Sequence, residues 1–387
     1  MINGIEKQNW NEVSIGFIAD EINEKVLSPK KSGCEKFIRP EDLETGELFI
    51  KKFRSPEDVG SGKFCFTGDI IFARRSVSVS QFKRRTSLLT FDAVCSDELT
   101  VIREKKKEVI PGFLNLVLNT TKLWDFAISK SVGSVSKRIK WEDLSQYTFP
   151  LPSKPEQEKI LSAFLNIEQL IEQAEQHEKN LLKLKKTLSN GLVSKEPVFG
   201  NLLSKKNCTP TNFGGVADCI EQHDKQKKDV SHFIGLENIE PENLSITTWG
   251  NIADGTTFTK RFLEGDVLFG KRRAYLKKVA VADFDGICSG DILVLRAKEK
   301  KILPELFPFY VSAEAFIQYA VSTSAGSLSP RTKWRDLASF EISIPDLKTQ
   351  GKIVEVFQQI QATLSQIETQ TQALKNLKQK LLNEILG

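Results

Sequence analysis

Apolar positions recur every seven residues in two long stretches of the chain. The seam of the first stretch comprises Ile160, Phe164, Ile167, Ile171, Ala174, Leu181 and Leu188. The seam of the second comprises Ile353, Phe357, Ile360, Leu364, Ile367, Leu374 and Leu381. A strict seven-residue repeat of apolar side chains drives left-handed pairing of helices. The pattern therefore predicts two long helices whose seams are buried.

The first of these helices has a start signal and a stop signal. Ser153 and Glu156 form an S-x-x-E capping box, and Asn190-Gly191 marks the end. About 37 residues lie between them, or about 55 Å of helix at 1.5 Å per residue. The companion position of the seams is interrupted by Glu178, Lys185, Thr371 and Lys378, which are expected to specify register. The two helices most simply pair with each other in antiparallel fashion; pairing with a second copy of the chain is the alternative.

An internal repeat decides the architecture. With a shift of 193, residues 91–111 lie over 284–304 with nine of 21 positions identical. At the same shift, GSVSKRIKWEDL (133–144) meets GSLSPRTKWRDL (326–337) with eight of twelve identical. Upstream, at a shift of 196, FIRPEDLETGELFI (37–50) corresponds to FIGLENIEPENLSI (233–246). A unit of about 190 residues therefore occurs twice, as a gene duplication would produce.

Each repeat begins with short β-like runs, such as DIIFA and DILVLRA, mixed with turn signals and a few helical stretches. The predicted fold class is α+β, with two homologous globular domains joined by two long antiparallel coiled-coil helices in a pseudo-twofold internal repeat. We expect a first head at 1–152, a first helix at 153–191, a second head at 192–345 and a second helix at 346–387.

Composition is that of a soluble globular protein, with 387 residues, 40% of them hydrophobic and 27% charged. We find no apolar run of about 18 residues, so no membrane span is expected. The first ten residues lack the features of a signal peptide, so a cytoplasmic location is expected. The six cysteines form no C-x-x-C pair and are expected to be reduced thiols, and only three histidines are present. The sequence therefore offers few residues that could form a metal site.

The candidate catalytic motifs of the sequence lack residues that their chemistry requires. Gly60-Ser61-Gly62-Lys63 resembles a phosphate-binding loop, but Glu57 and Phe64 replace residues that such a loop requires. No GxGxxG follows a strand, and no (D/N)-P-P-(Y/F) tetrapeptide occurs. A nuclease site can be drawn from Asp92 with residues 104–106, or from Asp285 with residues 299–301, but such spacing is common on charged surfaces. The sequence therefore predicts no catalytic centre.

Positive charge is clustered within the heads, although the formal net charge of +5 is mild. The candidate DNA-binding residues of the first head are Arg74, Arg75, Lys83, Arg84, Arg85, Arg138 and Lys140. Those of the second head are Lys271, Arg272, Arg273, Tyr275, Lys277, Lys278, Arg331 and Lys333. Such clusters suit a surface that follows phosphates and presents arginines to guanine edges. The alternative is a solvated basic loop. Two basic heads favour double-stranded DNA, because two half-sites can then be bound at once.

Three features together resemble the specificity subunit of type I restriction-modification systems. They are FGKRRAYLKKVAVADFDGICSGDILVLR (269–296), FIGLENIEPENL, and the two GS-x-S-x-R-x-KW-x-DL motifs that precede the heptad helices. The resemblance spans essentially the whole chain. It implies that each head is a target-recognition domain that reads one half of a bipartite DNA site. The helices would be spacers that fix the gap between the half-sites and dock two modification subunits.

The resemblance further implies that this chain binds no cofactor of its own. S-adenosylmethionine would be used by the methyltransferase (modification) subunits, and ATP and magnesium by the restriction/translocase subunits. The first head lacks the K-x-R-x-Y core of residues 271–275. The resemblance therefore implies that the two half-sites differ and that the target is not a palindrome.

Some interpretations stay open at this stage. Trp141 and Trp334 are expected to pack at the junction of head and helix, in preference to stacking on bases. Arg138 and Arg331 have two equal interpretations, phosphate contact or pairing with the helix. Two rival functions remain, a coiled-coil adaptor with protein-binding heads and a stand-alone nuclease.

Overall fold

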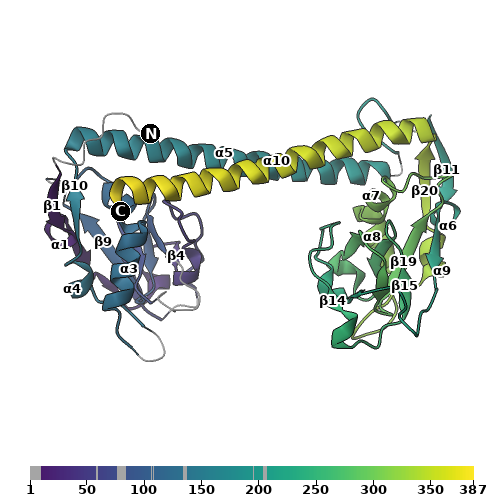
Figure 1. Cartoon of the computed structure of the whole chain (residues 1–387), viewed down its shortest axis with the longest axis horizontal. Helices are drawn as coiled ribbons and strands as arrows, with labels where there is room; N and C mark the ends of the chain where they lie inside the picture. Colours follow the sequence, from purple (N-terminus) through teal and green to yellow (C-terminus); the bar gives the residue numbers. More distant parts are fainter. Residues whose placement is uncertain are drawn as a thin grey trace. The chain divides into compact units, whose positions relative to one another are not determined.

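A computed structural model describes residues 10–57, 60–75, 84–105, 107, 109–133, 137–194, 196–203 and 207–387. The chain divides into two compact units (Figure 1). Unit 1 comprises Met1–Gln176 with Ile367–Gly387, and unit 2 comprises His177–Gln366. Each unit therefore contains one head together with parts of both long helices.

The head of unit 1 contains three small sheets. A two-stranded sheet pairs β1 (Asn11–Ser14) with β10 (Thr148–Leu151). An antiparallel sheet has the order β2 (Ala19–Ile22), β9 (Leu99–Glu104), β6 (Ile70–Ala73) and β7 (Thr86–Leu88). The third has the order β3 (Lys25–Val26), β5 (Gly62–Cys65), β8 (Ala93–Cys95) and β4 (Phe37–Ile38), in which β4 and β8 are parallel. The α-helices of the head are α1 (Ile15–Ile18), α2 (Phe113–Leu118), α3 (Thr121–Lys130) and α4 (Trp141–Leu144).

The head of unit 2 repeats the first two sheets of unit 1, and its third sheet shares three strands with that of unit 1 but has a different fourth strand. A two-stranded sheet pairs β11 (Cys208–Asn212) with β20 (Glu341–Pro345). The second sheet has the order β12 (Ala217–Ile220), β19 (Ile292–Ala297), β16 (Val267–Gly270) and β17 (Val279–Val281). The third has the order β14 (Gly250–Asn251), β13 (His232–Ile234), β18 (Gly286–Cys288) and β15 (Lys260–Phe262), with β13 and β18 parallel. Its α-helices are α6 (Phe213–Val216), α7 (Phe307–Val311), α8 (Glu314–Ser322) and α9 (Trp334–Ala338). The prediction of two homologous α+β domains is confirmed.

Two long helices occur where the heptad pattern predicts them. They are α5 (Lys154–Leu192, 39 residues) and α10 (Leu347–Leu386, 40 residues). At the start of α5, the Glu156 carboxylate accepts from the backbone N–H of Ser153 at 3.0 Å and from its hydroxyl at 2.7 Å. Gly191 lies inside the last turn of α5, where a Cβ would meet the Val198 carbonyl oxygen at 2.2 Å. Gly191 therefore permits a close backbone approach, and the helix continues past it.

Within unit 1, the two long helices run in opposite directions. Glu168 contacts Lys378, and Glu175, one heptad further along α5, contacts Lys375, which lies earlier in α10. Because the residue numbers of successive contacts rise along α5 and fall along α10, the two helices form an antiparallel pair, as the sequence predicts. Among the described residues, no helix is long and apolar enough to cross a membrane.

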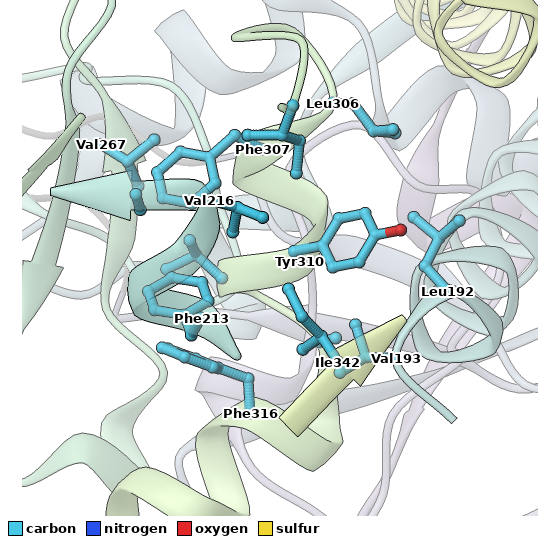
Figure 2. Packing of buried hydrophobic residues seen from close by; sticks show 14 of the residues in the cluster. Leu192, Val193, Phe213, Val216, Val267, Leu306, Phe307, Tyr310, Phe316 and Ile342 are labelled. Atoms are coloured by element: carbon cyan, nitrogen blue, oxygen red, sulfur yellow. The ribbon is translucent and has the colours of Figure 1, made fainter. Parts of the chain in front are cut away.

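The hydrophobic core of each head continues into the helix seams. In unit 2 the aromatic side chains of Phe213, Phe307, Tyr310 and Phe316 pack in one cluster with Leu192 at the end of α5 (Figure 2). In unit 1 the core cluster joins residues of the head to both long helices: Phe113, Trp124, Ile160, Phe164, Leu382 and Leu386. Burial of apolar surface therefore holds each head against its helices.

A buried glutamine near the start of each long helix joins the helix to its head. Gln157 accepts from the Ile110 N–H at 2.9 Å and donates to the Pro152 carbonyl at 2.9 Å. Gln350 accepts from the Leu303 N–H at 2.8 Å and donates to the Pro345 and Lys301 carbonyls at 2.9 and 3.0 Å. The two residues are equivalent in the repeat, so the junction has the same hydrogen-bonding design in both units.

Candidate nucleic-acid interface

The basic stretch of unit 2 forms a tight loop after β16. Arg273 and Lys277 both have a left-handed backbone with φ of 53°, which is uncommon for residues other than glycine. The Arg273 N–H donates to the Pro330 carbonyl at 2.8 Å, and the Thr332 N–H donates to the Lys271 carbonyl at 3.1 Å. The loop is therefore pinned to the 325–332 segment, and the two basic regions of this head lie together.

Several cations of this loop already have partners in the protein. Asp291 accepts from Arg331 at 2.7 Å and lies 3.5 Å from Arg272, and the hydrogen bond from Arg331 lowers the pKa of Asp291. Lys277 makes ion pairs with Glu314 at 2.9 Å and Glu242 at 3.2 Å, and the hydrogen bond with Glu314 raises the pKa of Lys277. These contacts assign Arg272, Lys277 and Arg331 to holding the loop.

A second group in unit 2 is left available. Tyr275 is 51% exposed, and Arg273 is exposed with a single weak contact from its guanidinium to the Leu328 carbonyl at 3.5 Å. Lys271 and Lys333 have no ion pair with any residue that the structure describes. Lys278 donates to the Leu236 carbonyl at 2.6 Å and has no carboxylate partner among the same residues. The cations that remain free to meet a polyanion are therefore fewer than the sequence clusters contain.

The cations of unit 1 show the same division. Arg75 pairs with Glu98, as Arg272 does with Asp291 at the equivalent positions. Arg84 donates to the Thr121 hydroxyl at 2.7 Å, and burial lowers the pKa of Arg84. The remaining described cations of this head either donate to backbone carbonyls or are exposed. Arg74 donates to the Asp97 carbonyl at 2.5 Å, Arg85 donates to the Pro40 carbonyl at 3.3 Å, and Arg138 and Lys140 are exposed; Lys83 lies outside the described residues.

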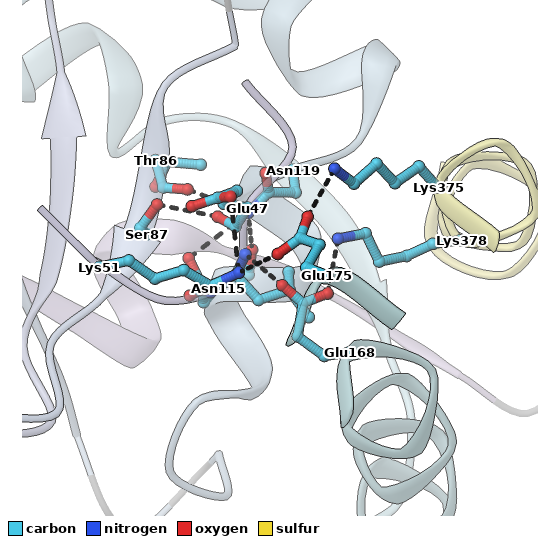
Figure 3. A network of polar contacts seen from close by, with 11 residues as sticks. Glu47, Lys51, Thr86, Ser87, Asn115, Asn119, Glu168, Glu175, Lys375 and Lys378 are labelled. Carbon is cyan, nitrogen blue, oxygen red and sulfur yellow. Dashed lines mark hydrogen bonds and ion pairs between the residues drawn. The ribbon is translucent and has the colours of Figure 1, made fainter. Parts of the chain in front are cut away.

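The predicted seam residues line the inward face of the long helices. Ile160, Phe164, Ile171, Ile353, Phe357, Ile360 and Leu364 are buried, and Ile167, Leu181, Leu188, Leu374 and Leu381 are half-buried. The seam in unit 1 also contains a charged pair. Glu168 and Lys378 lie 2.6 Å apart and are each only 6% exposed (Figure 3). In unit 2 the equivalent positions hold Gln361 and Lys185, which are 2.8 Å apart.

A polar network surrounds the charged pair of unit 1. Glu175 accepts from Lys375 at 2.8 Å and from Lys51 at 3.4 Å, which lies in the head (Figure 3). Burial raises the pKa of Glu47 in the same network. The Asn115 amide donates to the Leu48 carbonyl at 2.9 Å. The network therefore links a loop of the head to both long helices within unit 1.

An aromatic cluster at equivalent positions of the two heads was missed by the sequence analysis. In unit 1, the Lys36 ammonium lies 4.9 Å from the ring centroid of Phe53 and 4.2 Å from that of Phe91. In unit 2, the corresponding group is His232, Trp249 and Phe284, with ring centroids 5.4 to 5.8 Å apart. Phe53 and Trp249 are about half exposed. The aligned repeats contain the signal, since an aromatic residue occupies the same position in both.

The tryptophans of the paired motifs belong to the cores. Trp334 packs edge-on against Phe213 with ring centroids 5.9 Å apart, and Trp141 packs against the core of unit 1. This placement favours packing over base stacking. Of the two arginines left open, Arg331 pairs with Asp291 of its own head, and Arg138 is exposed.

The acidic residues that suggested a nuclease are engaged in turns. Asp92 accepts from the N–H and the hydroxyl of Thr67, at 2.8 and 3.0 Å, and these hydrogen bonds lower the pKa of Asp92. Asp285 accepts from the Glu264 N–H at 2.9 Å and lies 3.7 Å from Arg261. Among the described residues, no three His, Cys, Asp or Glu side chains are grouped to hold a metal ion.

Comparison with known proteins gives a consistent set of relatives. Residues 7–184 and 215–376 match the family described as the type I restriction modification DNA specificity domain. The chain is 30% identical over 137 residues to the type I restriction enzyme EcoDI specificity subunit of Escherichia coli. That alignment covers 34% of this chain and 30% of the relative, so the chain spans less than a third of that subunit's length in the match.

Two solved structures share the fold across the chain. One is described as the structural basis underlying complex assembly and conformational transition of the type I R-M system, with a TM-score of 0.60, 19% identity and 97% coverage of both chains. The other is a type I restriction-modification system S subunit from M. genitalium, with a TM-score of 0.52, 13% identity, and 100% and 97% coverage. The family match covers both repeats and most of the residues. The chain therefore belongs to the family of type I restriction-modification DNA specificity domains.

Proposed function

We propose that this chain is the DNA specificity subunit of a type I restriction-modification complex and catalyses no reaction itself. The observation that carries the proposal is the double match, because a DNA specificity domain corresponds to residues 7–184 and again to 215–376. Two such domains in one chain suit a bipartite site, in which each head reads one half. The heads differ at the K-x-R-x-Y core of residues 271–275, which supports two unlike half-sites and a target that is not a palindrome.

We assign residues 1–152 and 192–345 to the target-recognition domains, and 153–191 and 346–387 to the spacer helices. In unit 2, the residues that support DNA reading best are Lys271, Arg273, Tyr275 and Lys333, because they lack strong partners among the residues that the structure describes. An arginine that reaches a guanine edge discriminates bases, whereas a lysine on phosphate contributes sequence-independent affinity. In unit 1, Arg138 and Lys140 have the same exposed character.

Each unit also carries exposed leucines on its part of the long helices, where protein partners could make contact. Exposed leucines lie on them at Leu165, Leu170, Leu182, Leu184 and Leu377, with 39 to 51% of each side chain accessible. Exposed apolar side chains on a helix are available for contact with another protein. We assign these positions to contacts with two modification subunits, with restriction/translocase subunits joining the complex. S-adenosylmethionine, ATP and magnesium would be used by those partners.

Footprinting of the assembled complex tests the proposal. Removing one heptad from each long helix shortens the helices by about 10 Å, which corresponds to about three base pairs at 3.4 Å each. The gap between the half-sites is expected to shrink by that amount while both half-sites keep their sequences. A footprint with unchanged spacing would contradict the spacer role.

A pair of substitutions tests the reading surface. Arg273→Ala is expected to relax selectivity at one half-site by about 1–3 kcal/mol, with the other half-site unaffected. Lys277→Ala is the matched control on the same loop, and it is expected to weaken that half-site through loss of the loop's ion pairs without changing base preference. Equal loss of selectivity from both changes would refute this assignment. Cleavage of DNA by the chain with magnesium alone would support the nuclease alternative, and failure to retain any duplex with modification subunits present would support an adaptor.

A further inference from the structure

A lysine in the interior of unit 1 lacks a counter-ion. Lys63 on β5 is only 3% exposed, and its ammonium donates to the Leu99 carbonyl. Among the described residues, no carboxylate lies within ion-pair distance of it. Burial lowers the pKa of Lys63. A buried ammonium without an anionic partner is costly, because the protein interior solvates charge poorly.

The second repeat shows what is missing. Lys260 on β15 is equivalent to Lys63, since Lys63 pairs with Cys95 and Lys260 with Cys288 in the same register. Lys260 is also 3% exposed, and its ammonium lies 2.9 Å from the Glu221 carboxylate. Glu221 is the first residue after β12.

The corresponding position in unit 1 holds a neutral residue. Ile22 pairs with Val101 at the end of β2, just as Ile220 pairs with Val294 at the end of β12. The residue that follows Ile22 is Asn23, so an asparagine stands where the second repeat has Glu221. The buried lysine is therefore kept in both heads, and its carboxylate partner only in the second.

A pocket of about 390 Å³ opens at this place in unit 1, and Asn23, Lys25, Lys63 and Arg74 all line it. The Nε of Arg74 is buried and has no hydrogen-bond acceptor among the described residues. Two carboxylates line the pocket as well. Those of Glu21 and Asp97 belong to its wall, and the Asp97 carboxylate accepts from the Ser61 hydroxyl at 2.6 Å. Three cations thus face two acids, and neither acid reaches the buried ammonium.

We propose that this pocket binds a phosphate oxyanion, which takes the place next to Lys63 that the Glu221 carboxylate takes next to Lys260. Arg74 Nε and the ammonium groups of Lys63 and Lys25 supply the donors. A phosphodiester of bound DNA and free phosphate share this chemistry. The DNA source rests on the proposed function, whereas the oxyanion site does not.

Equilibrium dialysis of the full chain with radiolabelled orthophosphate, at constant ionic strength in chloride, tests the site. Wild type is expected to bind phosphate in this pocket. Asn23→Glu supplies the missing carboxylate and is expected to weaken binding at least about tenfold. Asn23→Gln is the uncharged control and is expected to keep binding. The reciprocal change, Glu221→Asn, is expected to create a second site in unit 2.

Lys63→Met provides a second test, since it replaces the ammonium by an apolar chain of similar length and is expected to abolish phosphate binding. Unchanged phosphate binding in both Asn23→Glu and Lys63→Met would overturn the proposal.

The source of the oxyanion, a DNA phosphate or free phosphate, is then identified with the assembled complex on duplex DNA. If a DNA phosphate is bound, Asn23→Glu makes the plot of log K against log salt less steep, and the magnitude of its slope falls by about 0.9, the value for one phosphate contact. Loss of orthophosphate binding with an unchanged slope assigns the pocket to a free oxyanion. Failure of the wild-type complex to bind any duplex would reject the proposed function and leave the dialysis result intact.

Discussion

The charged pair between the long helices in unit 1 gives a sharp prediction about stability. Lys378→Met removes the ammonium that lies 2.6 Å from Glu168, and both side chains of the pair are only 6% exposed. Methionine fills a similar volume, so the change is chiefly one of charge. Among the described residues, the hydrogen bond that the Glu168 carboxylate then keeps is a long one of 3.4 Å from the Leu48 N–H.

The expected magnitude follows from this burial. Removing one partner of a buried ion pair costs about 3–5 kcal/mol, because the remaining charge stays unsolvated. The repeat offers a matched control in Lys185→Met, since Lys185 at the equivalent position donates to the neutral Gln361 amide at 2.8 Å. Loss of a hydrogen bond to a neutral group costs about 1 kcal/mol. The two substitutions are therefore expected to differ by about 2–4 kcal/mol, although both replace lysine by methionine.

Hydrogen–deuterium exchange measured by mass spectrometry tests this difference locally. Peptides from residues 367–386 are expected to exchange about a hundredfold faster in Lys378→Met, which corresponds to about 3 kcal/mol of lost protection. Peptides from residues 177–192 are expected to change by less than about tenfold in Lys185→Met. Replacing Glu168 by Met in the Lys378→Met background is expected to restore most of the protection, since an apolar pair suits the seam. Equal effects of the two single substitutions would refute the reasoning.

Three further predictions concern the heads and their junctions. Burial raises the pKa of Glu104 from 4.5 to about 7, so between these pH values the folded state holds a proton that the unfolded state has released. The stability of unit 1 is therefore expected to fall by about 3 kcal/mol as pH rises from 4.5 to 7. Glu104→Ala is expected to lose that pH dependence in urea unfolding measured at several pH values. Gln350→Leu removes the acceptor of the Leu303 N–H and the donor to the Pro345 and Lys301 carbonyls, and is expected to cost about 3 kcal/mol in unfolding experiments. Gly62→Ala would place a Cβ 2.6 Å from the Cys95 carbonyl oxygen and is expected to lower the thermal midpoint by several degrees, whereas Gly60→Ala, with nothing within 4 Å, is expected to leave it unchanged.

Periodicity and repetition made the architecture predictable. A seven-residue pattern survives in the sequence of a helix however far away its partner lies, so the seams at Ile160 and Ile353 could be recognised without any knowledge of contacts. The alignment of the repeats likewise required two similar heads. The parallel pairing of β4 with β8 could not be predicted, because these strands join segments that are more than 50 residues apart.

The candidate interface was less predictable for a specific physical reason. A cluster of cations is visible in the sequence, but the acids that neutralise it lie on other elements. Asp291 lies 40 residues from Arg331, and Glu314 lies 37 residues from Lys277. Only the fold brings these charges together, and it divides one basic stretch into residues that hold the loop and residues that stay available. The ion pair between Glu168 and Lys378 could not be predicted for the same reason, since the two residues are 210 positions apart in the sequence.

The glutamines Gln157 and Gln350 have a consequence for the evolution of such chains. Among the described residues, each binds backbone groups of the adjoining head, so these hydrogen bonds do not depend on which side chains the head carries. A head transplanted from another chain with the same backbone path would therefore form the same hydrogen bonds with the existing helix. New combinations of halves can then arise by recombination at the helix starts, provided that the new head also matches the apolar residues of the helices against which it packs.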